Sequence, residues 1–224
     1  MVGQVGSETK KVPASSRAYA WIKNQIIRGY FAEGSYIEEE IVCSAIGVSR
    51  TPVREAFRQL AAERFIALSP RRGAQVITVT ARDIAETYEV RRLMEYHACR
   101  DIVGRGIKPP EEMSEILAVM HEPDKVDRCL AGDPDAWYEA VQLDIRFHRA
   151  IVSATGNALL TEFYDTLRAR QHRVSLTAVR NPERKILINE EHTALYESLV
   201  AGDAEQAVEV LSKHLQPINQ RLGH

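Results

Sequence analysis

One aspartate and three histidines in the second half of the sequence have types and spacing suited to metal chemistry. Asp144 and His148 are spaced i, i+4, so they share a face if this segment is helical. His192 lies ten residues before the Gly202-Asp203 turn and His214 eleven residues after it, so antiparallel helices would bring both to one level. Three imidazoles and one carboxylate suit Zn²⁺ first, with Ni²⁺, Mn²⁺ and Fe²⁺ as alternatives. An i, i+4 Asp/His pair is usually a surface contact, which is the competing interpretation.

A second group of polar residues could recognise nucleic acid. Ser49, Arg50, Thr51 and Arg54 stand at the start of a predicted helix whose first turn contains Pro52. Arginine can bind the O6 and N7 atoms of guanine in the major groove, while Ser49 and Thr51 can donate to phosphates. The alternative is a solvated basic helix without a nucleic-acid partner.

An arginine-containing turn follows that helix. Residues 66–68 and 75–79 have the pattern of two strands, and Arg71, Arg72 and Gly73 lie in the turn between them. Both arginines would then stand at the tip of a hairpin, beside a DNA backbone or minor groove.

The segment over 15–80 has the pattern of a winged helix-turn-helix domain. Helices are predicted over 17–27 and 38–46, and a third begins after Ser49. The apolar stripe of that third helix consists of Val53, Phe57 and Leu60. Because a hairpin follows the three helices, we expect a small β wing beside the recognition helix.

The segment over 81–224 is predicted to be an all-α antiparallel helical bundle. It has helical periodicity throughout and no convincing strand, which leaves about six or seven helices between its breaks. Those breaks fall at 104–110, 122–124, 132–134, 156–157, 181–182 and 202–203. The domain boundary is expected near 79–83, and its shortness indicates that the two domains are coupled.

The composition excludes several classes of protein. The chain has 224 residues, of which 45% are apolar and 27% charged, as in globular proteins of one or two domains. No apolar run approaches the roughly 18–20 residues of a membrane span. Residues 1–14 form a polar tail, expected to be disordered, without the apolar core of a secretory signal. Three distant cysteines support neither a disulfide framework nor a metal knuckle, so a cytoplasmic location fits best.

The charge is distributed unevenly between the halves. Residues 1–80 contain 11 Lys and Arg against 7 Asp and Glu, whereas 81–224 contain 18 against 24. A basic first half beside an acidic second half indicates two modules, of which the first has a polyanionic partner.

The strings GVSRTPVREAFRQL and PRRGAQV resemble the recognition helix and wing of GntR-type bacterial transcription regulators. This resemblance spans about residues 16–79. It implies that Arg50 and Arg54 contact bases or phosphates, that Thr51 contacts a phosphate, and that the backbone of Gly73 contacts DNA.

Two residues depart from the GntR pattern. Glu40 stands where the family often has arginine, which implies that one phosphate contact is missing. Arg64 stands where the family usually has glycine, at the end of the recognition helix. Arg64 must therefore adopt an unusual backbone conformation, or the turn differs.

The acidic half resembles FCD, the helical effector-binding domain of the FadR branch of the GntR family. The strings EVRRLMEYHA, DIRFHRAIVSATGN and EEHTALYESLVAGD carry the resemblance, together with His214 near the end of the chain. The metal ligands of that family are one aspartate and three histidines, which fall on Asp144, His148, His192 and His214. In that family a small carboxylate effector or water fills the remaining positions on the ion, and the resemblance implies the same here.

One arginine matches the pocket arginine of FCD domains. Arg91 stands in EVRRLME, and a guanidinium can hold a carboxylate in a fork. The alternative for Arg91 is an ion pair with Glu95, its i+4 neighbour. Glu190 and Glu191 precede His192 and could orient a ligand histidine, although a solvated helix start explains them equally.

These observations predict a metabolite-responsive repressor rather than an enzyme. We expect a homodimer that binds palindromic operator DNA and is released by a small carboxylate effector at the metal. The alternative is a metal-dependent enzyme that uses the same four residues, but no nucleophile or acid/base dyad stands beside them. A helical interaction protein would leave the four residues unexplained.

Overall fold

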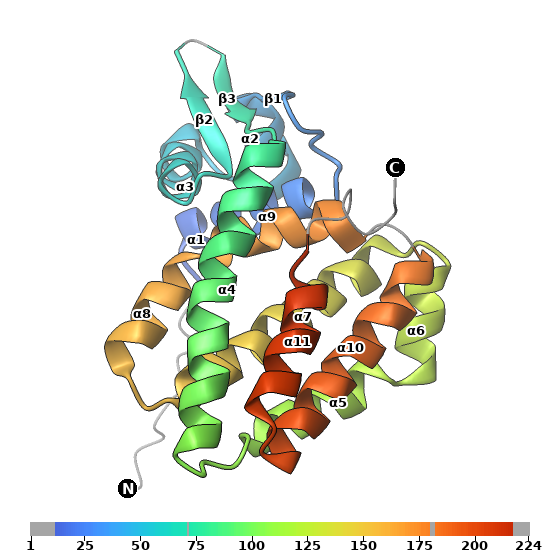
Figure 1. The fold of residues 1–224 in the computed structure, drawn as a ribbon. Coiled ribbons are helices and arrows are strands. Elements are labelled where there is room, and N and C mark those ends of the chain that lie inside the picture. Colours follow the sequence, from blue (N-terminus) through green and yellow to red (C-terminus); the bar gives the residue numbers. More distant parts are fainter. Residues whose placement is uncertain (1–11, 71, 180–181, 217–224) are drawn as a thin grey trace, which may run out of the picture. The chain divides into compact units, whose positions relative to one another are not determined.

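The structure is a computed structural model that describes residues 12–70, 72–179 and 182–216. The chain divides into two compact units, Met1–Thr78 and Val79–His224 (Figure 1). The expected disordered tail lies outside the described residues up to residue 11, and the first helix begins at Ala14. No helix in the described ranges is both long and apolar enough to cross a bilayer.

The first unit is a three-helix domain with a small sheet. Its elements are α1 (Ala14–Ile27), β1 (Tyr36–Ile37), α2 (Glu39–Ile46), α3 (Arg50–Ala62), β2 (Ile66–Ser69) and β3 (Gly73–Val76). The strands are antiparallel in the order β1-β3-β2. The predicted helices and hairpin are confirmed, but the second strand covers Gly73–Val76 rather than 75–79, so Gly73 begins the strand instead of lying in the turn. Strand β1 was not predicted because a strand of two residues carries no alternation.

The turn between α2 and α3 follows from Gly47. Its φ of 66° gives α2 a left-handed C-cap, which lets the chain reverse within Gly47-Val48 before α3 begins. Val53, Phe57 and Leu60 are buried, as their spacing predicts, so the polar side of α3 remains exposed.

Two backbone positions shape the hairpin. Arg64 has a φ of 59°, which is a left-handed backbone conformation. This agrees with the expectation for a residue that stands where the GntR family usually has glycine. Gly73 has a φ of 84°, and a Cβ there would lie 2.3 Å from the carbonyl oxygen of Ile37. Gly73 is therefore required for the close approach of β3 to β1, independently of any contact with DNA.

The second unit contains helices and no strand among its described residues. They are α4 (Ala81–Gly104), α5 (Glu111–Met120), α6 (Pro123–Leu130), α7 (Pro134–Ala154), α8 (Ala158–Thr166), α9 (Arg168–Val179), α10 (Pro182–Ala201) and α11 (Ala204–His214). The prediction of six or seven helices was wrong, because the chain also breaks at Leu167, where neither glycine nor proline marks the turn. The mostly α fold class is confirmed.

Helix α7 is central to the bundle. It packs against α4, α5, α8 and α9, while α11 packs against α4 and α10. Figure 1 shows α10 and α11 side by side, joined by a tight turn. This arrangement directs the inner faces of α4, α7, α10 and α11 into one interior.

Candidate functional site

Four candidate ligand atoms converge inside the helical unit. Nε2 of His148 lies 3.0 Å from Nε2 of His192 and 3.0 Å from Nε2 of His214. Oδ1 of Asp144 lies 3.2 Å from His192 Nε2, 3.8 Å from His148 Nε2 and 3.9 Å from His214 Nε2. The histidines are buried, and Asp144 is partly exposed. The structure thus brings together all four residues that the sequence selects.

The helices explain this convergence. Asp144 and His148 lie one turn apart on α7. Gly202, with a φ of 73°, ends α10, and the side chain of Asp203 accepts a hydrogen bond from the backbone of Gln206 to begin α11. The resulting hairpin places the ring centroids of His192 and His214 4.6 Å apart.

Two glutamates fix the orientation of two histidine rings. Nδ1 of His148 lies 2.7 Å from Oε2 of Glu95, and Nδ1 of His214 lies 2.8 Å from Oε2 of Glu191. An ionised carboxylate only accepts hydrogen bonds, so each Nδ1 is the donor and a neutral ring presents a lone pair at Nε2. Glu191 therefore supports His214 rather than the adjacent His192.

The electrostatics favour neutral rings beside ionised carboxylates. Burial lowers the pKa of His192 to about 3 and also lowers the pKa of His214. For Asp144, burial acts in the opposite direction, but the hydrogen bond from His192 and the neighbouring His148 hold its pKa well below the usual range. The centre therefore offers a carboxylate and, at His192 and His214, neutral imidazoles, which are the forms that bind metals.

These residues fit a divalent transition metal. Two ligands about 2.1 Å from one ion are about 3.0 Å apart at a right angle and about 3.4 Å apart in a tetrahedron. The distances of 3.0 and 3.2 Å lie in that range. The 3.8 and 3.9 Å from Asp144 Oδ1 to His148 and His214 exceed it and correspond to wider angles at the ion.

Arg91 lies beside this centre, deep in the bundle. Its Nε donates to Oε1 of Glu95 at 2.8 Å, which is the ion pair that its sequence spacing allows. Its Nη2 is buried and has no hydrogen-bond partner among the described residues. The guanidinium therefore keeps one donor for a further acceptor.

Glu95 and Tyr164 were missed as parts of the site. Oε1 of Glu95 accepts from Arg91 and, at 2.7 Å, from the hydroxyl of Tyr164. Although burial opposes ionisation, Arg91 and His148 keep the pKa of Glu95 below its ordinary value. The i, i+4 spacing indicated the contact with Arg91, but no sequence signal joined Glu95 to His148, 53 residues away.

The residues predicted to contact DNA lie at the start of α3 and on its exposed face. Ser49 precedes the helix with extended backbone and makes no side-chain cap, and Thr51 is exposed. Nε of Arg54 lies 2.7 Å from Oε1 of Glu39, and Nη2 of Arg50 lies 3.6 Å from Oε2 of Glu40. The two arginines are thus adjacent to consecutive carboxylates on α2.

The turn between β2 and β3 is described in part. Arg72 is exposed, and its guanidinium lies 5.7 Å from the ring centroid of Tyr36. Gly73 follows it and begins β3. Arg71, the other arginine predicted at the wing tip, lies outside the described residues.

Comparisons with known proteins give matches across both units. Residues 14–76 match the family of bacterial regulatory proteins called gntR, and residues 86–217 match the FCD domain. The HTH-type transcriptional repressor GlaR of Escherichia coli is 27% identical over 206 residues, which are 88% of this chain and 90% of that protein. The gluconate operon transcriptional repressor of Bacillus subtilis is 31% identical over 160 residues, covering 71% of this chain and 62% of the relative.

A solved structure has the same architecture. It is a transcriptional regulator from Rhodococcus sp. RHA1, described as a putative GntR protein, with a TM-score of 0.70 and 28% identity. The similarity covers 93% of this chain and 97% of that chain.

Proposed function

Because the chain belongs to the GntR family of bacterial regulatory proteins and contains an FCD domain, we propose that it is a metabolite-responsive transcription repressor. A small carboxylate bound at the metal centre of the helical unit releases it from operator DNA. The observation that carries this proposal is the convergence of four ligand atoms beside an arginine with an unused donor.

Asp144, His148, His192 and His214 hold the ion, with Zn²⁺ as the first choice and Ni²⁺, Mn²⁺ or Fe²⁺ as alternatives. A bound divalent ion supplies a Lewis acid that attracts a carboxylate oxygen. The protein itself holds three histidine rings and one carboxylate in place. Glu95 and Glu191 support this arrangement by accepting hydrogen bonds from Nδ1 of His148 and of His214.

Arg91 binds the carboxylate of the effector. Its Nη2 has no hydrogen-bond partner in the described part of the chain, and an unpaired buried donor is destabilising until an acceptor arrives. A guanidinium and a carboxylate form a charge-assisted pair, so an organic acid satisfies this donor better than a neutral ligand does. Gluconate, which appears in the name of one relative, belongs to this chemical class.

The exposed face of α3 and the wing bind DNA. Arg50 and Arg54 contact bases or phosphates, Ser49 and Thr51 contact phosphates, and the wing contributes Arg71, Arg72 and the backbone of Gly73. A homodimer places two such helices on a palindromic operator. The effector needs to couple to DNA binding by only about 1–3 kcal/mol to act as a switch.

DNA titration of the metal-loaded protein tests this function. Duplexes from the region upstream of its own gene are titrated by fluorescence anisotropy, with gluconate, citrate and succinate added in turn. We expect one acid to weaken DNA binding roughly 5–150-fold in the wild type and in the control Arg100→Met, which alters an exposed arginine of α4.

Arg91→Met should keep its DNA affinity and lose the response to the acid. An equal response in Arg91→Met and wild type would reject the role of Arg91. Failure of the wild type to bind any of the upstream duplexes would reject the repressor function itself.

A further inference from the structure

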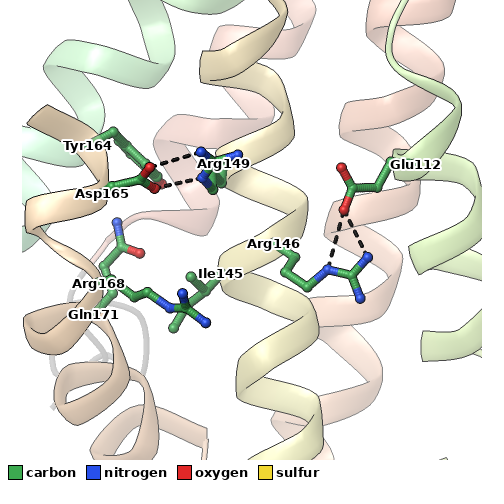
Figure 2. A pocket seen from close by; sticks show the side chains of 8 residues that line it. All are labelled: Glu112, Ile145, Arg146, Arg149, Tyr164, Asp165, Arg168 and Gln171. Carbon is green, nitrogen blue, oxygen red and sulfur yellow. Dashed lines mark hydrogen bonds and ion pairs between the residues drawn. The ribbon is translucent and has the colours of Figure 1, made fainter. Parts of the chain in front are cut away.

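The helical unit contains a second polar cavity that none of the four metal-binding candidates lines. It lies between α5, α7 and the α8–α9 segment and has a volume of about 260 Å³ (Figure 2). A cavity of about 150 Å³ is large enough to hold benzene, so this one accommodates a small organic molecule.

The charges in this cavity leave one cation without a direct ion pair among the described residues, although it lies near enough to Asp165 to help lower the pKa of that carboxyl. Arg149 forms a two-pronged ion pair with Asp165, with N–O distances of 2.6 and 2.8 Å, and Arg146 pairs with Glu112 at 2.8 Å. Arg168 makes no hydrogen bond or ion pair with the described residues, and Figure 2 shows it extending from α9 toward α7. The five charged groups together therefore carry one net positive charge, located at Arg168.

A buried amide next to Arg168 also lacks a partner. Gln171 lines the cavity, is only 2% exposed, and its Nε2 makes no hydrogen bond with the described residues. Exchanging the nitrogen and oxygen of the amide would leave a buried oxygen in the same position. An unpaired buried polar atom is destabilising, so this position favours a ligand that bonds to it.

The remaining wall is apolar. Ile145 and the ring of Tyr164 are almost fully buried and border the same space. A ligand that matches the whole cavity therefore has one negative charge for Arg168 and a polar atom that can bond to the amide of Gln171. It also has a compact apolar part that packs against this wall. Phosphate matches less well, because its second charge would have no cation and it has no apolar surface.

We propose that this cavity binds a small organic monocarboxylate. Arg168 pairs with the carboxylate, Gln171 bonds to one of its oxygens, and Ile145 and Tyr164 pack against the apolar part. This site is additional to the effector site at the metal centre and does not rest on it.

The position of the cavity also links it to the metal centre. The hydroxyl of Tyr164 donates to Glu95, and the other oxygen of Glu95 accepts from Nδ1 of His148. A ligand packed on Tyr164 is therefore separated from a metal-binding histidine by two hydrogen-bonded side chains. A ligand in the cavity would therefore affect the position of His148 by shifting the ring of Tyr164 and, through it, Glu95.

The test uses 4-fluorobenzoate as the probe, observed by ¹⁹F NMR with full-length, metal-loaded protein. We expect wild type to bind it, and Arg168→Ala to bind it at least about tenfold more weakly, since one charge-assisted pair is lost. Gln171→Leu should weaken binding several-fold. Arg170→Ala is the matched control, because this exposed arginine of α9 does not line the cavity.

Removal of the metal by a chelator distinguishes this cavity from the metal centre, because the probe should still bind the metal-free protein. If chelation abolished binding while Arg168→Ala did not weaken it, the probe would sit at the metal and the inference would be wrong. No binding to wild type, equal affinity in Arg168→Ala and Arg170→Ala, or displacement by equimolar phosphate would each overturn it as well.

Discussion

The carboxylate of Glu95 lies 2.7 Å from Nδ1 of His148, and both side chains are fully inaccessible to solvent. This contact fixes which ring nitrogen carries the proton and so turns Nε2 toward Asp144, His192 and His214. The same glutamate accepts from Arg91, the residue proposed to hold the effector. One buried carboxylate therefore contacts both a candidate metal ligand and the arginine proposed for the effector.

The first prediction concerns that carboxylate. Glu95→Gln preserves the shape of the side chain but removes the charge that favours the Nδ1–H tautomer of His148. We expect metal affinity to fall about 10–100-fold, as for other partners of metal-bound histidines. Competition with a chromophoric chelator measures this change.

Glu209→Gln is the control, because Glu209 is exposed on α11 and pairs with Lys213. It should bind metal like the wild type. A Glu95→Gln protein with wild-type metal affinity would show that Glu95 only compensates the charge of Arg91.

The second prediction concerns metal content and stability. Wild-type protein should contain one ion per chain, and chelation should lower its melting temperature. An ion present at 100 times its dissociation constant stabilises the fold by about 2.7 kcal/mol. His192→Ala should contain no ion, and its melting temperature should not respond to the chelator.

His97→Ala serves as the comparison, since His97 is exposed on α4. It should bind and release metal like the wild type. Elemental analysis that found one ion per chain in His192→Ala would reject the centre.

The sequence predicted the features that repeat along the chain and missed those that depend on distant contacts. The stripe of Val53, Phe57 and Leu60 was found because helical period determines burial. The meeting of His192 and His214 followed from residue counts on either side of one turn. Tyr164 was not found, because only the packing of α8 against α4 brings its hydroxyl to Glu95.

Boundaries without glycine or proline were also missed. The chain breaks at Leu167 between two helices, where the sequence shows an uninterrupted helical pattern. Strand β1 has only two residues, and its pairing with β3 depends on the close approach that Gly73 permits. Tertiary contacts determine both features, so local preference could not reveal them.

The third prediction concerns Arg64. Its left-handed backbone is unfavourable for a residue with a Cβ and suits glycine. Arg64→Gly should therefore raise the free energy of unfolding by up to about 1 kcal/mol. Calorimetry of the full chain measures the change.

Arg58→Gly is the opposite control, because Arg58 lies within α3 on its exposed side. Glycine in a helix interior should lower stability by about 1 kcal/mol. If both variants were destabilised equally, strain at Arg64 would not be the relevant factor.

The fourth prediction concerns Glu40, the acidic residue adjacent to Arg50. Its carboxylate lies 3.6 Å from the guanidinium of Arg50, at the position where related regulators often have arginine. Glu40→Arg removes a carboxylate that competes with DNA for the guanidinium of Arg50. The new arginine also adds a contact with a DNA phosphate. We expect tighter DNA binding at low salt and a salt dependence steeper by about 0.9 in the log–log slope, the value for one added phosphate contact.

Glu197→Arg makes the same change of charge on the exposed side of α10 and should leave the slope unchanged. Fluorescence anisotropy between 50 and 200 mM salt, a range over which phosphate contacts weaken measurably, separates the two variants. An unchanged slope in Glu40→Arg would mean that the start of α2 does not approach the DNA backbone and would contradict this prediction.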